Sequence, residues 1–191
     1  MSYAINFYWE RINTYKRSLQ RLNRILHYLM ITRSILFILI LFSIFILFKE
    51  HNSLFLLLFI LISFFTTIVY THINNRKIRV ISLKIRFCEI ELDFINMKYE
   101  NHFSGYEFAS LNTDFNSDFN IVGKNSLFQY LNRCYTYFAR KKLADNLLNF
   151  NHEKKDIILK QKAIKSLQQN QDFLLELRCL TSQLNNYVKF L

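Results

Sequence analysis

The chain has 191 residues, of which 51% are hydrophobic, and this length suits one modest domain beside a membrane anchor. It contains 20 Phe, only 2 Gly and no Pro, which argues against all-β folds because their turns need Gly and Pro, and predicts an all-α protein. The formal net charge is +11, and the densest positive charge lies directly before an apolar segment, which favours a membrane surface over a DNA-binding patch as its partner.

Residues 1–33 are predicted to form a cytoplasmic helical arm. They carry six Lys or Arg and one acidic residue. Their apolar residues alternate at spacings of three and four, which is the heptad pattern of a coiled-coil seam. The seam residues are Ile5, Tyr8, Ile12, Tyr15, Leu19, Leu22, Leu26 and Leu29.

Residues 34–70 are predicted to cross a bilayer as a hairpin. Ser34–Phe48 and Ser53–Tyr70 are uncharged runs, which extend roughly 22 and 27 Å as helices against a hydrocarbon core of about 30 Å. The first run needs residues 28–32 as well, with Arg33 reaching back to the headgroups. The linker Lys49–Asn52 is so short that the two helices must be antiparallel neighbours.

Three other interpretations of these runs fit less well. A signal peptide would begin closer to the N-terminus and would be followed by a small-residue cleavage site. A buried core hairpin would need more surrounding protein than this chain offers, and a re-entrant segment would need an interruption. Lys and Arg flank the hairpin on both outer sides, so we expect both termini in the cytoplasm.

Residues 71–100 are predicted to form a returning arm. Their seam residues are Ile78, Ile81, Ile85, Cys88, Leu92, Ile95 and Tyr99. The two arms would then pair as an antiparallel coiled coil. A second interpretation lays residues 3–29 flat on the membrane as an amphipathic helix. The period of 3.5 residues in both arms favours the coiled coil.

Residues 101–124 are predicted to be a linker, and residues 125–191 to begin a small helical domain. We expect helices from Asn125, after Asp156 and near Asp172. The first two would turn inward Leu127, Leu131, Tyr135, Phe138, Leu143 and Leu147, then Ile157, Ile158, Ala163, Ile164 and Leu167. The third would turn inward Phe173, Leu174, Leu177, Leu180 and Leu184, and its pattern runs to Leu191 without a stop signal, so the domain is expected to be truncated.

No residues form a recognisable catalytic or metal-binding pattern. Cys88, Cys134 and Cys179 lack a C-x-x-C spacing and are expected to be reduced and buried. The five histidines are scattered, and Asp114 and Asp118 share a loop whose sequence shows no pattern of acid–base chemistry. We therefore expect no enzyme activity from these residues.

The stretch 115–136 resembles the opening of the core domain of the MutS family of mismatch-repair ATPases. The resemblance rests on Gly123, Ser126-Leu127, Leu131-Asn132-Arg133, Thr136 and the run Lys160-Gln161-Lys162-Ala163-Ile164. With Phe103–Phe108, it is similar to bacterial MutS-related proteins that begin with a two-helix membrane anchor. The departures are Ala139 in place of Gly, Leu147-Leu148-Asn149 in place of a Pro-Leu, and Lys160 in place of Arg.

The resemblance implies a location in the bacterial inner membrane and a structural role for Gly123, Ser126, Leu127, Asn132, Arg133 and Thr136. ATP and Mg²⁺ would belong to a C-terminal domain of the family that this chain lacks. Gly123-Lys124 does not open a P-loop, because Asp118 and Asn125 occupy positions that need Gly and Ser or Thr. We expect no catalytic, ATP-binding or metal-binding residue here.

Two functions follow from the sequence. The chain is either the membrane-tethering N-terminal part of a MutS-related DNA-repair ATPase, or a membrane-anchored coiled-coil interaction protein with no nucleic-acid role, an inert gene remnant included. Under the first function the partners are the lipid bilayer, the DNA phosphate backbone, and a second copy or a separately encoded ATPase portion.

Overall fold

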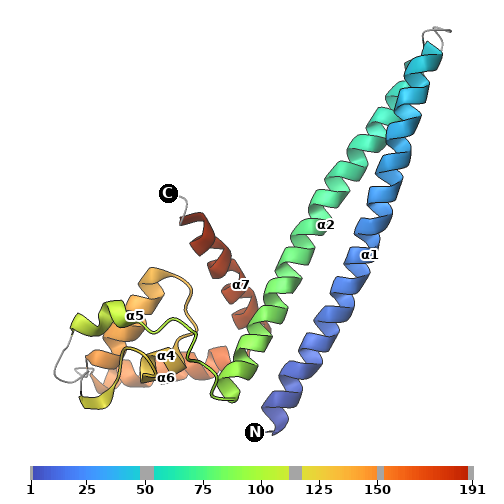
Figure 1. Cartoon of the computed structure of the whole chain (residues 1–191). Helices are drawn as coiled ribbons and strands as arrows, with labels where there is room; N and C mark the ends of the chain where they lie inside the picture. Colours follow the sequence, from blue (N-terminus) through green and yellow to red (C-terminus); the bar gives the residue numbers. More distant parts are fainter. Residues whose placement is uncertain (1, 48–53, 112–117, 150–152, 189–191) are drawn as a thin grey trace. The chain divides into compact units, whose positions relative to one another are not determined.

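The computed structural model describes residues 2–47, 54–111, 118–149 and 153–188, and every regular element in them is helical. The elements are α1 (Ser2–Leu47), α2 (Leu54–Ile95), the 3-10 helix η2 (Tyr106–Leu111), α4 (Leu127–Leu131), α5 (Tyr137–Leu148), α6 (Lys154–Gln168) and α7 (Gln171–Val188) (Figure 1). No β-strand occurs in these ranges, which confirms the all-α prediction. The predicted linker Lys49–Asn52 and Asp114 lie outside them.

The chain divides into two compact units. The first, here called the hairpin unit, is Trp9–Arg86. The second, here called the helical module, combines Met1–Tyr8 with Phe87–Leu191. Each contributes a different kind of surface, so they are described separately.

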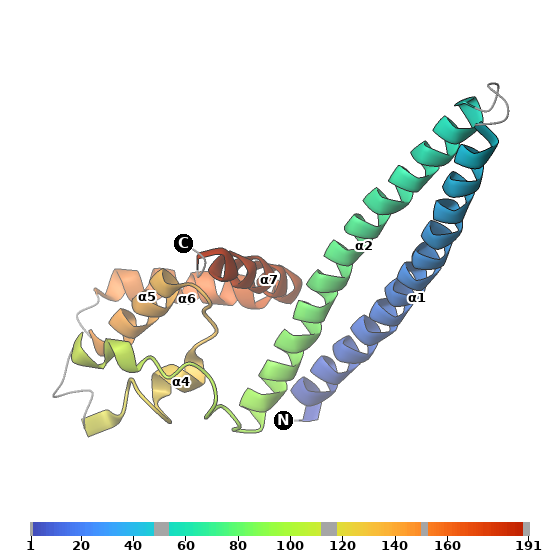
Figure 2. The same cartoon turned by 45° about the horizontal axis from the view of Figure 1, so that its top comes forward.

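In the hairpin unit α1 and α2 lie side by side and run in opposite directions (Figures 1 and 2). Both helices are long and apolar enough to cross a membrane. In a soluble protein such helices would be core elements, yet none of the most apolar stretch of α1 and only 6% of that of α2 is buried. Phe55, Phe59 and Phe65 are 88%, 73% and 66% exposed.

The predicted seam is the less exposed face of both helices. In the hairpin unit Ile12 and Ile85 are buried, and the other predicted seam positions between residues 15 and 81 are half-buried. Asn74 continues the seam by one step toward the apolar runs, and it is buried. Its Nδ2 donates a hydrogen bond to the carbonyl oxygen of Leu22 at 3.0 Å, so a polar contact joins α1 to α2. A buried Asn in a seam selects one register.

The helical module has an aromatic core to which the predicted linker contributes. One cluster of buried residues in this core consists of Phe108, Ile121, Val122, Phe128, Ala144 and Leu148, with Phe103, Leu143 and Leu147 packed against them. Segment 101–124 therefore does more than connect two parts: it contains η2 and supplies three of the core side chains. The apolar residues that pack here are spaced too irregularly to show a helical period.

The single helix predicted from Asn125 is wrong, because the chain breaks between α4 and α5. Asn132 ends α4 in an extended conformation, and Thr136 starts α5 with its side chain accepting the Ala139 N–H. This break shifts the helical phase. Leu127, Leu131 and Phe138, predicted to face inward, are 48%, 43% and 83% exposed, while Phe128, Ala144 and Leu148 are buried.

The helices predicted after Asp156 and near Asp172 are present as α6 and α7, but their inner faces differ from the prediction. Every residue of α6 is exposed, including Ile157, Ile158 and Ile164. In α7 the buried residues are Leu175, which follows the predicted Leu174, and Cys179, which precedes the predicted Leu180. Leu184 is outside the side chains that the structure describes.

Gly105 lets the chain pass directly over the core. Its φ is +73°, and a Cβ placed on it would lie 2.5 Å from Cε1 of Phe128, which is fully buried. Gly123 also has a positive φ, +135°, but the atom nearest to a Cβ there is Oδ1 of Asn120 at 3.8 Å. Only Gly105 is therefore limited by packing as well as by backbone conformation.

We predict that Gly105→Ala destabilises the module more than Gly123→Ala does. Overpacking against Phe128 should add about 1–3 kcal/mol to the cost of the backbone conformation. Pulse proteolysis of the full chain in detergent measures the free energy of unfolding of both variants. Equal losses would show that the Phe128 ring moves aside without cost.

Candidate functional site at the end of alpha 2

One carboxylate in the helical module holds two guanidinium groups. Glu91 lies on α2, and its Oε1 accepts hydrogen bonds from Nε of Arg133 at 2.9 Å and from Nη1 of Arg178 at 2.6 Å. The Glu91 and Arg178 side chains are 15% and 17% exposed, and that of Arg133 is 31% exposed. Partial burial strengthens such pairs, and the cluster ties α2 to the turn after α4 and to α7.

Aromatic rings orient the arginines. The guanidinium carbon of Arg133 lies 3.5 Å from the centre of the Phe94 ring, and that of Arg178 lies 5.0 Å from the centre of Phe87. Arg140 stacks in the same way at 4.1 Å from Phe103 and donates from Nε to the carbonyl oxygen of Cys134. Cation–π contacts of this kind restrict the direction in which each guanidinium donates.

Most of the residues on which the resemblance to the MutS family rests lie at or near the two ends of α4. Ser126 caps α4: its Oγ accepts from the Gln129 N–H and donates to the carbonyl oxygen of Gly123 at 2.7 Å. Asn132 ends α4 and its Oδ1 accepts from the Cys134 N–H at 2.9 Å. Thr136 caps α5.

Each of these side chains, with Arg133, thus has a local backbone or ion-pair partner. Leu127, which also belongs to the resemblance, has an apolar side chain that makes no such contact; it is 48% exposed and lies outside the core cluster.

Gln129 is a site residue that sequence reasoning missed. It is 1% exposed, and its Nε2 donates to the carbonyl oxygens of Glu100 at 3.1 Å and His102 at 2.6 Å. Its Oε1 accepts from the Asn125 N–H at 2.7 Å. Because Gln129 is polar, the spacing of apolar residues could not predict that it is buried. Its two hydrogen bonds hold the segment that follows α2 against α4.

A cavity of about 70 Å³ lies beside the cluster. Its lining includes His102, Cys134 and the three arginines Arg133, Arg140 and Arg178. Burial raises the pKa of the Cys134 thiol, so at neutral pH it stays protonated and is a poor nucleophile. Burial also acts to lower the pKa of Arg178, but Glu91 and Tyr135 outweigh it and the net pKa is raised. Arg178 is therefore charged at all physiological pH values.

The geometry is that of a joint between helices. In the described part of the chain no group of three or more His, Cys, Asp or Glu could hold a metal ion. The three arginines each donate to Glu91 or to a backbone carbonyl oxygen, but Nε and Nη2 of Arg178 are buried without a hydrogen-bond partner among the described residues. Such an arrangement positions α2 against α4 and α7 within the module.

Comparison of the chain with models of known protein families, with characterised proteins and with solved structures found no significant match.

We predict that Glu91→Gln loosens the module, whereas Glu89→Gln, at an exposed position two residues away, has little effect. Removing the carboxylate charge leaves two partly buried guanidinium groups without their counter-ion, which should cost roughly 3 kcal/mol. Hydrogen exchange of α4 and α7 in the full chain measures the change. Equal protection in both variants would show that the cluster does not hold these helices.

Proposed function

We propose that this chain is a membrane tether, in which α1 and α2 cross a bilayer as a hairpin and leave both ends of the chain on the cytoplasmic side. The observation that carries the proposal is the exposed apolar surface of the two helices. Arg11, Lys16, Arg17, Arg21 and Arg24 precede the first apolar run, and Arg76, Lys77, Arg79, Lys84 and Arg86 follow the second. By the positive-inside rule this distribution supports a cytoplasmic location for both flanks.

The half-buried seam supports coiled-coil pairing of the two arms beyond the membrane. In the hairpin unit every predicted seam residue is buried or half-buried, as are a few neighbours such as Ser18, Val80 and Leu83. An amphipathic helix lying flat on the membrane would not need Asn74 to donate to the carbonyl oxygen of Leu22. Pairing of the arms accounts for both observations.

We predict that cysteines introduced as His51→Cys and Ser2→Cys react with a membrane-impermeant maleimide from opposite sides of sealed vesicles. Position 51 belongs to the link between the two apolar runs and position 2 to the N-terminal flank. The unaltered chain, with its three native cysteines, gives the background. Labelling of both positions from one side would overturn the hairpin.

The narrower proposal is that the tether belongs to a MutS-related ATPase of the bacterial inner membrane. It is supported by the resemblance of residues 103–164 and by the capping and ion-pair contacts that Ser126, Asn132, Arg133 and Thr136 make. ATP and Mg²⁺ would be bound by a domain that these residues do not contain. A second copy or a separately encoded ATPase portion would be its partner.

Exposed lysines support a DNA contact under this proposal. Helix α6 carries five lysines and one acidic residue, all exposed. Lysines on one exposed helix can contact the phosphate backbone without reading sequence. The alternative function, a membrane-anchored interaction protein without a nucleic-acid role, is favoured by the exposed apolar residues of the same helix, of which Ile164 is 64% exposed.

We predict salt-sensitive binding of mixed-sequence duplex DNA by the full chain in zwitterionic nanodiscs. The double variant Lys160→Gln with Lys162→Gln should bind less DNA phosphate. The slope of log affinity against log salt concentration should become less negative by roughly 0.9 for each phosphate that the variant no longer neutralises. Lys16→Gln with Arg17→Gln removes the same charge from the hairpin unit and should leave the slope unchanged. No binding at low salt would favour the interaction protein.

A further inference from the structure

A groove between α1 and α2 flanks the apolar surface of the hairpin unit. Its volume is about 770 Å³, which is within the range of small-molecule sites. Its residues come from one stretch of each helix and are Ser18, Arg21, Leu22, Ile25, Ile73, Arg76, Lys77, Val80 and Ile81. The groove thus has an apolar floor and basic side chains at its rim. Ile25 and Ile73 in this lining are exposed, and further exposed apolar residues continue from them along both helices toward the link between the apolar runs.

The positive charge at this rim is not balanced by the surrounding sequence. Residues 11–88 contain twelve Lys or Arg and one acidic residue, Glu50, which belongs to the link between the apolar runs. Arg21, Arg76 and Lys77 are exposed, and in the described ranges no carboxylate pairs with them. An anion from outside the chain can therefore bind there without displacing an internal partner.

A phospholipid with a negatively charged headgroup matches both features. Its phosphate can accept paired hydrogen bonds from a guanidinium, and Arg21 and Arg76 offer one from each helix. One acyl chain would cover Leu22, Ile25 and Val80, which are otherwise left against water or headgroups. Basic pockets between membrane helices near the cytoplasmic surface bind anionic lipids on the same physical grounds.

We propose that this groove binds one anionic phospholipid, with the phosphate held by Arg21, Arg76 and Lys77 and an acyl chain along the apolar floor. The inference rests on the proposed membrane-spanning function, because the groove must lie at the level of the headgroups. It adds a specific lipid site to that function. The bound lipid would join α1 to α2 next to the Asn74 hydrogen bond.

The test measures which lipid stays with the purified full chain. The chain in detergent is incubated with equal amounts of phosphatidylglycerol and phosphatidylcholine of identical acyl chains, repurified, and analysed by mass spectrometry. Phosphatidylglycerol should be retained in excess, and Arg21→Gln with Arg76→Gln should weaken its retention by roughly tenfold or more. Glycerol phosphate, which lacks acyl chains, should not displace it.

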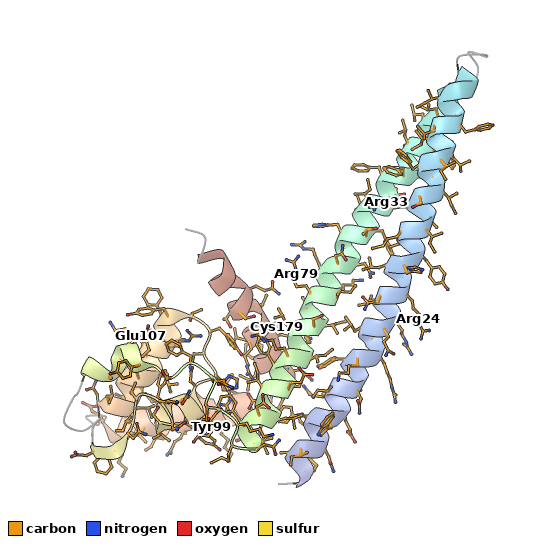
Figure 3. All side chains as sticks on the ribbon, viewed as in Figure 1. Arg24, Arg33, Arg79, Tyr99, Glu107 and Cys179 are labelled. Carbon is orange, nitrogen blue, oxygen red and sulfur yellow. The ribbon has the colours of Figure 1, made fainter. Side chains whose placement is uncertain are left out.

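The matched control is Arg17→Gln with Arg79→Gln, which removes one charge from each helix outside the groove. Figure 3 shows Arg79 on the outer side of α2, pointing away from α1. Retention in this variant should equal that of the unaltered chain. Val80→Phe narrows the floor and keeps every charge, so it should reduce retention independently of the rim.

Three outcomes would overturn the groove site: equal retention of the two lipids, equal loss in the test and control variants, or a dimer in which a second copy excludes lipid. Alkaline carbonate extraction of native membranes separates this failure from that of the proposed function. A chain that resists extraction but shows no lipid preference loses only the groove site. A chain that carbonate extracts is not a membrane tether at all.

Discussion

The apolar surface of α1 and α2 constrains everything else in this protein. Side chains such as Phe55, Phe59 and Phe65 are mostly exposed, and leaving a Phe in water instead of burying it costs about 1.5–3 kcal/mol. Two helices of 46 and 42 residues repeat that cost many times. Insertion into a bilayer would remove this cost. A helical hairpin also meets the requirement that only helices or closed barrels can span the hydrocarbon core. If the hairpin crosses a bilayer as proposed, the basic flanks and the polar contact of Asn74 would lie where headgroups and water can accept them.

The helical module solves a different problem, which is to hold short helices together with a small core. Helix α4 has five residues and α5 has twelve, so neither would be stable alone. Capping by Ser126 and Thr136 satisfies their free backbone N–H groups. Glu91 adds a long-range restraint, because it joins the end of α2 to a residue 87 positions away. Local caps and one shared carboxylate thus add to what the aromatic core contributes.

Periodicity predicted the two long helices as well as α6 and α7, but not the break between α4 and α5 or what the shorter helices pack against. The two long helices follow from local spacing, and the predicted seam residues are indeed among the less exposed ones in the hairpin unit. The break at Asn132 was missed because no Gly or Pro marks it; the Asn132 side chain makes the turn by accepting the Cys134 N–H. The Glu91–Arg178 pair was missed because no local pattern links residues so far apart. In α6 an amphipathic sequence predicted burial, yet the helix lies exposed, since propensity alone does not supply a partner.

The two units also treat positive charge in opposite ways, and this separates their roles. In the module Glu91 and the rings of Phe87 and Phe94 neutralise or cover the arginines from within, so their charge contributes to folding. In the hairpin unit twelve basic residues face two acidic residues, Glu10 and Glu50, so most of their charge can be balanced only from outside. A fold does not need such an imbalance, which costs self-repulsion. It is explained if the counter-charge is a permanent part of the surroundings, and under the proposed membrane function an anionic lipid surface would supply that counter-charge.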